Sequence, residues 1–278
     1  MINLGELSKP ATILIEKISD AIGGIFRPYQ IRRIAEAEAE ADKIRAVSHI
    51  EITALQDRAI RRFFVEEAKK QYNIETITEK ALPLLEDGAN PQNIEDDWIA
   101  HFFDRCRLIS DEQMQTLWSK VLAGEANNPG RYSKRTLNLI SSLDKADAEF
   151  FRKLCAFGWQ IGVMVPLIYD VNDKIYIDNG VYFNSLRHLE EIGLISFQFW
   201  AGYQRQGLPR KEVVLFFGKP FEIEFPQPKE NTLQLGTVLL SRAGEELAPI
   251  CEPAPCPGFQ EYVIAQWQSM GLVVKELT

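Results

Sequence analysis

The sequence has no apolar run near the ~20 residues that a membrane-spanning helix needs. It also lacks an excess of positive charge. Its net charge is −8, which argues against a general nucleic-acid coat, because cations on phosphates supply most of such a coat's affinity. No Cys-x-x-Cys pair, secretory leader, glycine-rich phosphate loop or serine nucleophile elbow is present. These absences predict a reduced, cytoplasmic, non-enzymatic protein without a cofactor.

Two of the four cysteines, Cys251 and Cys256, lie in the proline-rich loop CEPAPCPG. They are compatible with a disulfide or with half of a metal site. No second pair of metal-ligating residues follows them, so two ordinary thiols are the simpler interpretation.

The opening of the chain predicts an amphipathic helix. Ser8 and Pro10 are typical of a helix start, and apolar residues then recur at helical spacing. Residues 11–26 either pack on the rest of the chain or contact a membrane or a partner protein. The candidate contact residues are Ile18, Ile22, Ile25 and Phe26.

A second, longer helix is predicted from Tyr29 to about Tyr72, where the sequence is rich in Ala, Glu, Lys and Arg and has no proline or glycine. At about 1.5 Å per residue it would span roughly 60 Å, too far to bury its apolar stripe in a small domain. We therefore expect a homo-oligomer or a protein partner, joined through a helical hairpin or coiled coil.

Residues 90–157 predict a compact array of short helices, with Ser110, Ser133 and Asp144 at helix starts. Within it, Asp97, His101 and Asp104 share one helical face, where they are candidates for metal binding or acid–base chemistry. No second Glu/His pair completes a site, and a carboxylate in a first helical turn also favours the helix dipole. The preferred interpretation is therefore that they bind no metal.

After residue 157 the sequence becomes richer in β-branched and aromatic residues. Strands are predicted around GVMVPLIYD and KIYIDNG, followed by a helix at 182–192, a strand at 194–202, a loop at 203–209 and further strands and helices. A helix ending in Gly193, a β-hairpin and the segment LLSRAGEELAPI resemble winged-helix regulators. The resemblance implies a fold and leaves the function open.

If this region is a DNA-binding winged helix, its contacts come from the recognition helix and the wing tip. The candidate residues are Arg187, His188, Arg205, Arg210 and Lys211. Against DNA binding, residues 144–278 contain 12 Lys and Arg residues but 17 Asp and Glu residues. Docking of a protein is therefore the favoured alternative.

Two stretches carry a family resemblance. The opening LSKPATILIEKISDAIGGIFRPYQIRRIAEAEAEADKIRA resembles an uncharacterised bacterial family of unknown function. The middle stretch, LWSKVLAGEANNPGRYSKRTLNLISSLDKADAEFF, is similar to that family and to the abortive-infection alpha proteins of phage defence. The resemblance implies a cytoplasmic bacterial protein in a defence or stress locus, and it implies no catalytic residue.

We therefore predict an α+β, mainly helical chain of three parts: long helices at 1–89, a helical array at 90–157 and a winged-helix-like domain at 158–278. The favoured function is non-enzymatic assembly or docking of a macromolecule, without a small-molecule substrate. The alternatives are a DNA-binding regulator and a membrane-acting effector that uses residues 11–26.

Overall fold

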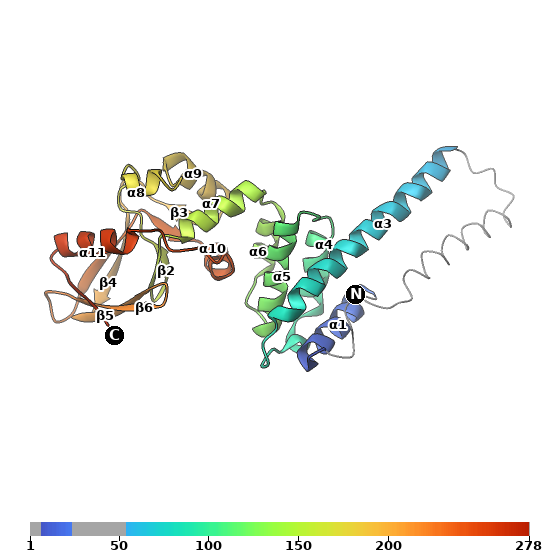
Figure 1. Cartoon of the computed structure of the whole chain (residues 1–278), viewed down its shortest axis with the longest axis horizontal. Helices are drawn as coiled ribbons and strands as arrows, with labels where there is room; N and C mark the ends of the chain where they lie inside the picture. Colours follow the sequence, from blue (N-terminus) through green and yellow to red (C-terminus); the bar gives the residue numbers. More distant parts are fainter. Residues whose placement is uncertain (1–6, 24–53, 278) are drawn as a thin grey trace. The chain divides into compact units, whose positions relative to one another are not determined.

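The computed structural model describes residues 7–23 and 54–277, and Figure 1 shows their helices and strands. The chain divides into two compact units, Met1–Ser141 and Ser142–Thr278. The first unit is helical where it is described, and the second combines helices with antiparallel sheets, which confirms the predicted α+β class. Ile25, Phe26 and the first part of the predicted long helix lie outside the described residues.

The division after Ser141 differs from the boundaries expected at residues 89 and 157. Two kinds of packing explain the difference. In the first unit, helices from both sides of residue 89 share one core, since α1 (Lys9–Ile22) packs on α4 (Asp96–Cys106). In the second unit, α7 (Lys145–Cys155) packs on α9 (Phe183–Ile192).

The first helix begins as the sequence predicts. Oγ of Ser8 accepts a hydrogen bond from the Ala11 amide at 3.4 Å, and α1 ends at Gly23. Its buried face includes Leu14 and Ile18, both fully buried. Among the described residues, no helix combines the length and apolar character needed to cross a membrane.

The long helix is confirmed over its described part, α3 (Ala54–Ala81), and it continues beyond the predicted end near Tyr72. The extension is stabilised by burial, because Ile74, Ile77 and Ala81 lie in the core and α3 packs against α5 (Glu112–Asn127). From 54 to 72, in contrast, α3 has no buried residue. The helical unit is completed by η2 (Leu82–Leu84), η3 (Pro91–Asn93) and α6 (Lys134–Ser141).

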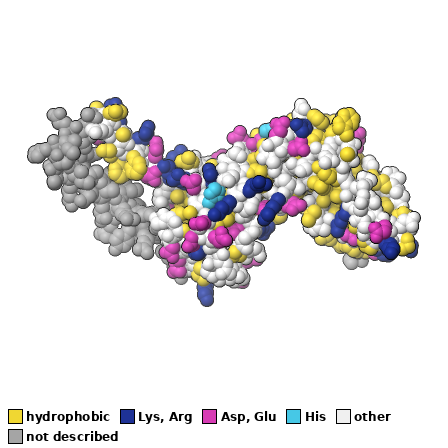
Figure 2. Space-filling model, turned by 180° about the vertical axis from the view of Figure 1, so that it is seen from behind, with side chains coloured by type: hydrophobic (Ala, Val, Ile, Leu, Met, Phe, Trp, Pro, Cys, Tyr) yellow, Lys and Arg dark blue, Asp and Glu magenta, His cyan; other side chains and the backbone are white. Residues whose placement is uncertain are grey.

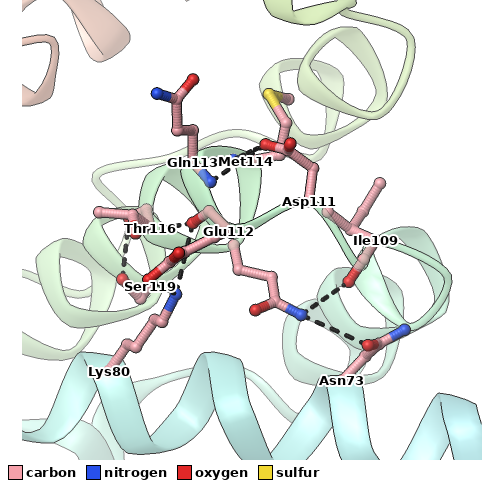
Figure 3. A network of polar contacts seen from close by, with 10 residues as sticks. Asn73, Lys80, Ile109, Asp111, Glu112, Gln113, Met114, Thr116 and Ser119 are labelled. Atoms are coloured by element: carbon pink, nitrogen blue, oxygen red, sulfur yellow. Dashed lines mark hydrogen bonds and ion pairs between the residues drawn. The ribbon is translucent and has the colours of Figure 1, made fainter.

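A polar network joins α3 to the start of α5 (Figure 3). Nε2 of Gln115 on α5 donates to Oδ1 of Asn73 on α3 at 3.3 Å and to the Ile109 carbonyl at 3.0 Å. Nδ2 of Asn73 donates to the Arg107 carbonyl at 2.9 Å. The predicted cap at Ser110 is wrong by one residue. Oδ1 of Asp111 accepts from the amides of Gln113 and Met114, both at 3.0 Å, so the aspartate caps α5.

The second unit contains one five-stranded sheet, in the order β2-β1-β5-β6-β9, and two separate pairs, β3-β8 and β4-β7. All its strand pairings are antiparallel, apart from an isolated parallel bridge between Ile168 and Gly236. The strands are β1 (Gly158–Ile161), β2 (Val163–Pro166), β3 (Ile195–Phe197), β4 (Tyr203–Leu208), β5 (Lys211–Phe216), β6 (Lys219–Glu224), β7 (Asn231–Gly236), β8 (Val238–Leu240) and β9 (Val273–Glu276).

The helices of this unit are α7, α8 (Lys174–Ile177), α9, α10 (Arg242–Leu247), η4 (Ala248–Ile250) and α11 (Phe259–Ser269). The helix predicted at 182–192 is confirmed as α9, which ends at Gly193. Asp144 caps α7 as predicted. The core is strongly aromatic: Trp159 and Trp267 are fully buried with ring centroids 4.8 Å apart.

Two predictions for this unit are wrong. Residues 174–177 form the short helix α8 rather than a strand, because Tyr176 is fully buried and its hydroxyl donates to the Leu167 carbonyl at 2.8 Å. Residues 203–208 form strand β4, paired with β7, rather than a loop. The chain between β3 and β8 therefore holds four strands instead of a simple wing.

Candidate docking site in the C-terminal unit

The structure places the first two predicted DNA contacts on α9, next to carboxylates. The guanidinium of Arg187 lies 2.6 Å from Oε2 of Glu190 and 3.7 Å from Oε1 of Glu191. Nε2 of His188 lies 2.6 Å from Oδ1 of Asp147 on α7. Both side chains are about half exposed, yet each already has an acidic partner.

The other three predicted contacts lie on or beside strands β4 and β5. Arg205 donates to the Ile161 carbonyl at 2.7 Å and lies 3.7 Å from Glu212. Arg210 pairs with Glu224 at 2.9 Å, and Lys211 pairs with Glu222 at 2.7 Å.

Strand register explains the last two pairs. The β5–β6 pairing sets Lys211 opposite Glu224, so basic residues at the start of β5 meet glutamates on β6. The hydrogen bond from Lys211 to Glu222 raises the pKa of the lysine. On the face shown in Figure 2, basic and acidic side chains are interspersed rather than gathered by sign. The predicted cations are thus brought to carboxylates and not to one basic surface.

An aromatic pocket of about 510 Å³ opens beside Arg187. We call it the aromatic pocket; its lining is Phe183, Arg187, Phe197, Gln198, Phe199, Trp200 and Ala201. Phe183 comes from the first turn of α9, and the other aromatic residues come from the end of β3 and the turn that follows it. Cavities of this size and apolar character are typical binding sites.

The rings of the aromatic pocket contact one another edge to face. Ring centroids are 5.5 Å apart for Phe183 and Phe197, 5.2 Å for Phe183 and Phe199, and 4.9 Å for Phe199 and Trp200. Trp200 is nevertheless 92% exposed. Sequence reasoning missed this pocket because it assigned residues 194–202 to one strand. The sequence signal for the pocket is the run FQFW. It has three aromatic residues, which is more than a short strand can bury.

The three candidate metal ligands are not assembled into a site. Nε2 of His101 lies 2.9 Å from Oδ1 of Asn138, Asp104 pairs with Arg107 at 2.9 Å, and Asp97 is exposed. Over residues 7–23 and 54–277, no group of three or more His, Cys, Asp or Glu side chains is arranged to hold a metal ion.

The described candidates for membrane or partner contact lie on the inner side of α1. Ile18 is fully buried in the helical unit, and Ile22 is partly buried. In the described part of the chain, Cys251 and Cys256 of the proline-rich loop form no disulfide, and Cys256 is buried with its thiol 3.7 Å from the Pro257 carbonyl.

The fold and the site define an α+β protein with a helical unit and a sheet-containing unit that carries an aromatic pocket. The model of a family described as "Protein of unknown function (DUF2806)" matches residues 57–264, about three quarters of the chain. The chain therefore belongs to this family, which agrees with the predicted resemblance to a family of unknown function. Neither a curated protein nor a solved structure matches it.

Proposed function

We propose that the chain is a non-enzymatic assembly protein whose C-terminal unit docks a protein partner. Three features of the unit support a winged-helix-like module: the helices α7, α8 and α9, the antiparallel pair β3–β8 that follows them, and α10 after β8. The unit differs from a simple winged helix in two insertions, β1 and β2 between α7 and α8, and β4 to β7 between β3 and β8. The resemblance to abortive-infection alpha proteins supports a setting in the cytoplasm of bacteria that defend against phage.

One observation carries the choice of protein over DNA. The side chain of each of the five predicted DNA contacts has a nitrogen within 3.7 Å of a carboxylate oxygen. A phosphate would have to displace these partners, and the remaining charge of the unit is negative. Apolar and aromatic side chains, by contrast, are available on its surface.

Self-assembly through α3 is the second part of the proposal. Between 54 and 72 this helix exposes large apolar side chains, among them Leu55, Phe63, Val65 and Tyr72. Its charged residues form pairs along the helix, such as Asp57 with Arg61 at 2.9 Å. Such a helix is stabilised by burial against a second copy of itself.

The test combines duplex-DNA binding across a salt series with mass measurement by light scattering. We expect no salt-sensitive DNA binding and a mass above that of one chain. Phe63→Glu should lower the mass, while Gln113→Glu, at an exposed position on α5, should not. Salt-sensitive binding that disappears in an Arg205/Arg210/Lys211→Ala variant would instead establish a DNA-binding regulator, and a monomeric wild type would remove the assembly role.

A further inference from the structure

The aromatic pocket exposes more apolar surface than its role in the core of the unit requires. Phe197 is 8% exposed and belongs to the core, but Phe183 is 42%, Phe199 36% and Trp200 92% exposed. Aromatic residues left on a surface around a pocket are typical of the centre of a protein interface, where Trp and Tyr dominate the binding energy. The pocket is therefore suited to a ligand that inserts an apolar or aromatic side chain.

The charge around the pocket selects the kind of occupant. Among the described residues that line it, Arg187 is the only charged one, and two glutamates neutralise this cation. Oε1 of Glu190 also accepts a hydrogen bond from the amide of Phe197 at 2.9 Å, which fixes the carboxylate beside the pocket. Arg187, Glu190 and Glu191 together carry a net negative charge. The whole unit, with 17 acidic and 12 basic residues, has the same sign.

Aromatic ring faces add to this preference, because their negative π-clouds attract cations. Trp200 and Phe199 line the pocket together with Arg187, whose guanidinium pairs with Glu190 and Glu191 of α9. We propose that the aromatic pocket binds a basic peptide segment of a partner protein. The aromatic or aliphatic side chain of the segment enters the pocket, and its flanking Lys or Arg residues contact the ring faces and Glu191.

Single-stranded nucleic acid is the principal competitor, since bases also stack on exposed aromatic residues. Its phosphates, however, need cations that are not already paired. Arg187 offers a charge that two carboxylates already balance, so the observations favour the peptide.

The inference rests on the proposed docking of a protein by this unit. It is tested with the full chain and three fluorescently labelled peptide libraries, each with a central Trp. The flanking positions are fixed as Lys in the first, Ser in the second and Glu in the third. Oligo-dT and a DNA duplex are measured in parallel, all by fluorescence anisotropy.

We expect the Lys library to bind most tightly, with affinity reduced about tenfold by Trp200→Ala. Trp200 is exposed, so this variant should fold normally. Val213→Ala, at an exposed apolar position on β5 of the same unit, is the matched control and should bind as the wild type does. Glu191→Lys should weaken binding of the Lys library, whereas Glu261→Lys on α11 should not.

Equal binding of the three libraries, or binding that Trp200→Ala leaves unchanged, would overturn the inference. Oligo-dT binding that Trp200→Ala removes would assign the pocket to nucleic acid instead. The proposed function fails separately, through duplex binding that is lost in the Arg205/Arg210/Lys211→Ala variant. If no peptide library and no DNA binds, the basic-peptide inference is wrong while protein docking by another surface stands.

Discussion

Asp147 and His188 join the first and third helices of the C-terminal unit through one carboxylate. Oδ1 of Asp147 lies 2.6 Å from Nε2 of His188, and Oδ2 accepts a hydrogen bond from the amide of Asp144 at 2.9 Å. The aspartate therefore completes the capping box of α7 and fastens α9 to it.

Asp147→Ala should lower the free energy of unfolding by about 1–2 kcal/mol, because it removes the cap contact and the link to α9 together. Asp147→Asn keeps an acceptor for the Asp144 amide and should cost less. Glu149→Ala on the same helix is the control. Its pair with Arg152 is about half exposed, and loss of such a pair costs roughly 0–1 kcal/mol. Urea unfolding measures all three, and equal losses for Asp147→Ala and Glu149→Ala would contradict the linking role.

Gly236 lies where β7 ends and makes the parallel bridge to Ile168. Its φ is +80°, and a Cβ at this position would lie 2.3 Å from the Ile168 carbonyl oxygen. Gly236→Ala should therefore cost at least about 2–3 kcal/mol, from left-handed strain plus a clash with backbone. Gly207 on β4 has a similar φ of +72° but open space around it.

The matched variant Gly207→Ala should accordingly cost only about 1–2 kcal/mol. Thermal unfolding of both variants separates the steric effect from the conformational one. If the two variants unfold at the same temperature, the close approach of β7 to Ile168 does not constrain the fold.

Because one side of α1 is buried, a test of membrane contact by α1 needs a variant that does not also unfold the helical unit. Because Ile18 is fully buried, Ile18→Asp should unfold the helical unit, with a loss of about 4 kcal/mol or more. Ile22 is only partly buried, so Ile22→Asp should be milder and is the appropriate variant for liposome binding. Circular dichroism with heating compares them, and similar melting temperatures would show that α1 does not depend on Ile18.

Alkaline pH should weaken the C-terminal unit through Tyr262. Burial, together with the hydrogen bond to Asp173, raises the pKa of Tyr262 to about 12. The unfolded chain has a tyrosine pKa of about 10, so folding favours the neutral phenol. This stabilisation is complete below about pH 10 and is lost between about pH 10 and 12. Burial also raises the pKa of Tyr169 and of Tyr176, which adds to the same trend.

Tyr262→Phe isolates this effect, because it removes the ionisable hydroxyl and keeps the ring. We expect the variant to lose less stability than the wild type between about pH 10 and 12, as measured by urea unfolding at each pH. Identical pH profiles would show that Tyr262 is solvated in the folded protein.

Helices with clear boundary signals could be predicted from the sequence. Ser8, Asp144 and Gly193 mark helix ends in the sequence, and the structure has helix ends there. The errors come from tertiary contacts. Tyr176 belongs to a segment with strand-like composition, yet burial of its ring and a hydrogen bond to Leu167 place it in a helix.

The candidate site was only partly predictable, for a different reason. Arg210 and Lys211 are visible in the sequence as cations, but their glutamate partners are known only once the register of β5 and β6 is known. Likewise, the aromatic pocket requires Phe183 and Trp200, which are separated by a helix and a strand, to meet around one cavity. No local sequence pattern predicts that these two side chains line the same cavity.

The five-stranded sheet also has a consequence for the order of folding. β1 and β2 come from residues 158–166, β5 and β6 from 211–224, and β9 from 273–276. Their pairing closes long loops, and topologies of this kind fold slowly. During synthesis, one edge of β6 stays unpaired until β9 has left the ribosome. The helical unit ends at Ser141 and leaves the ribosome before the sheet is complete, so the two units can fold at different times during synthesis.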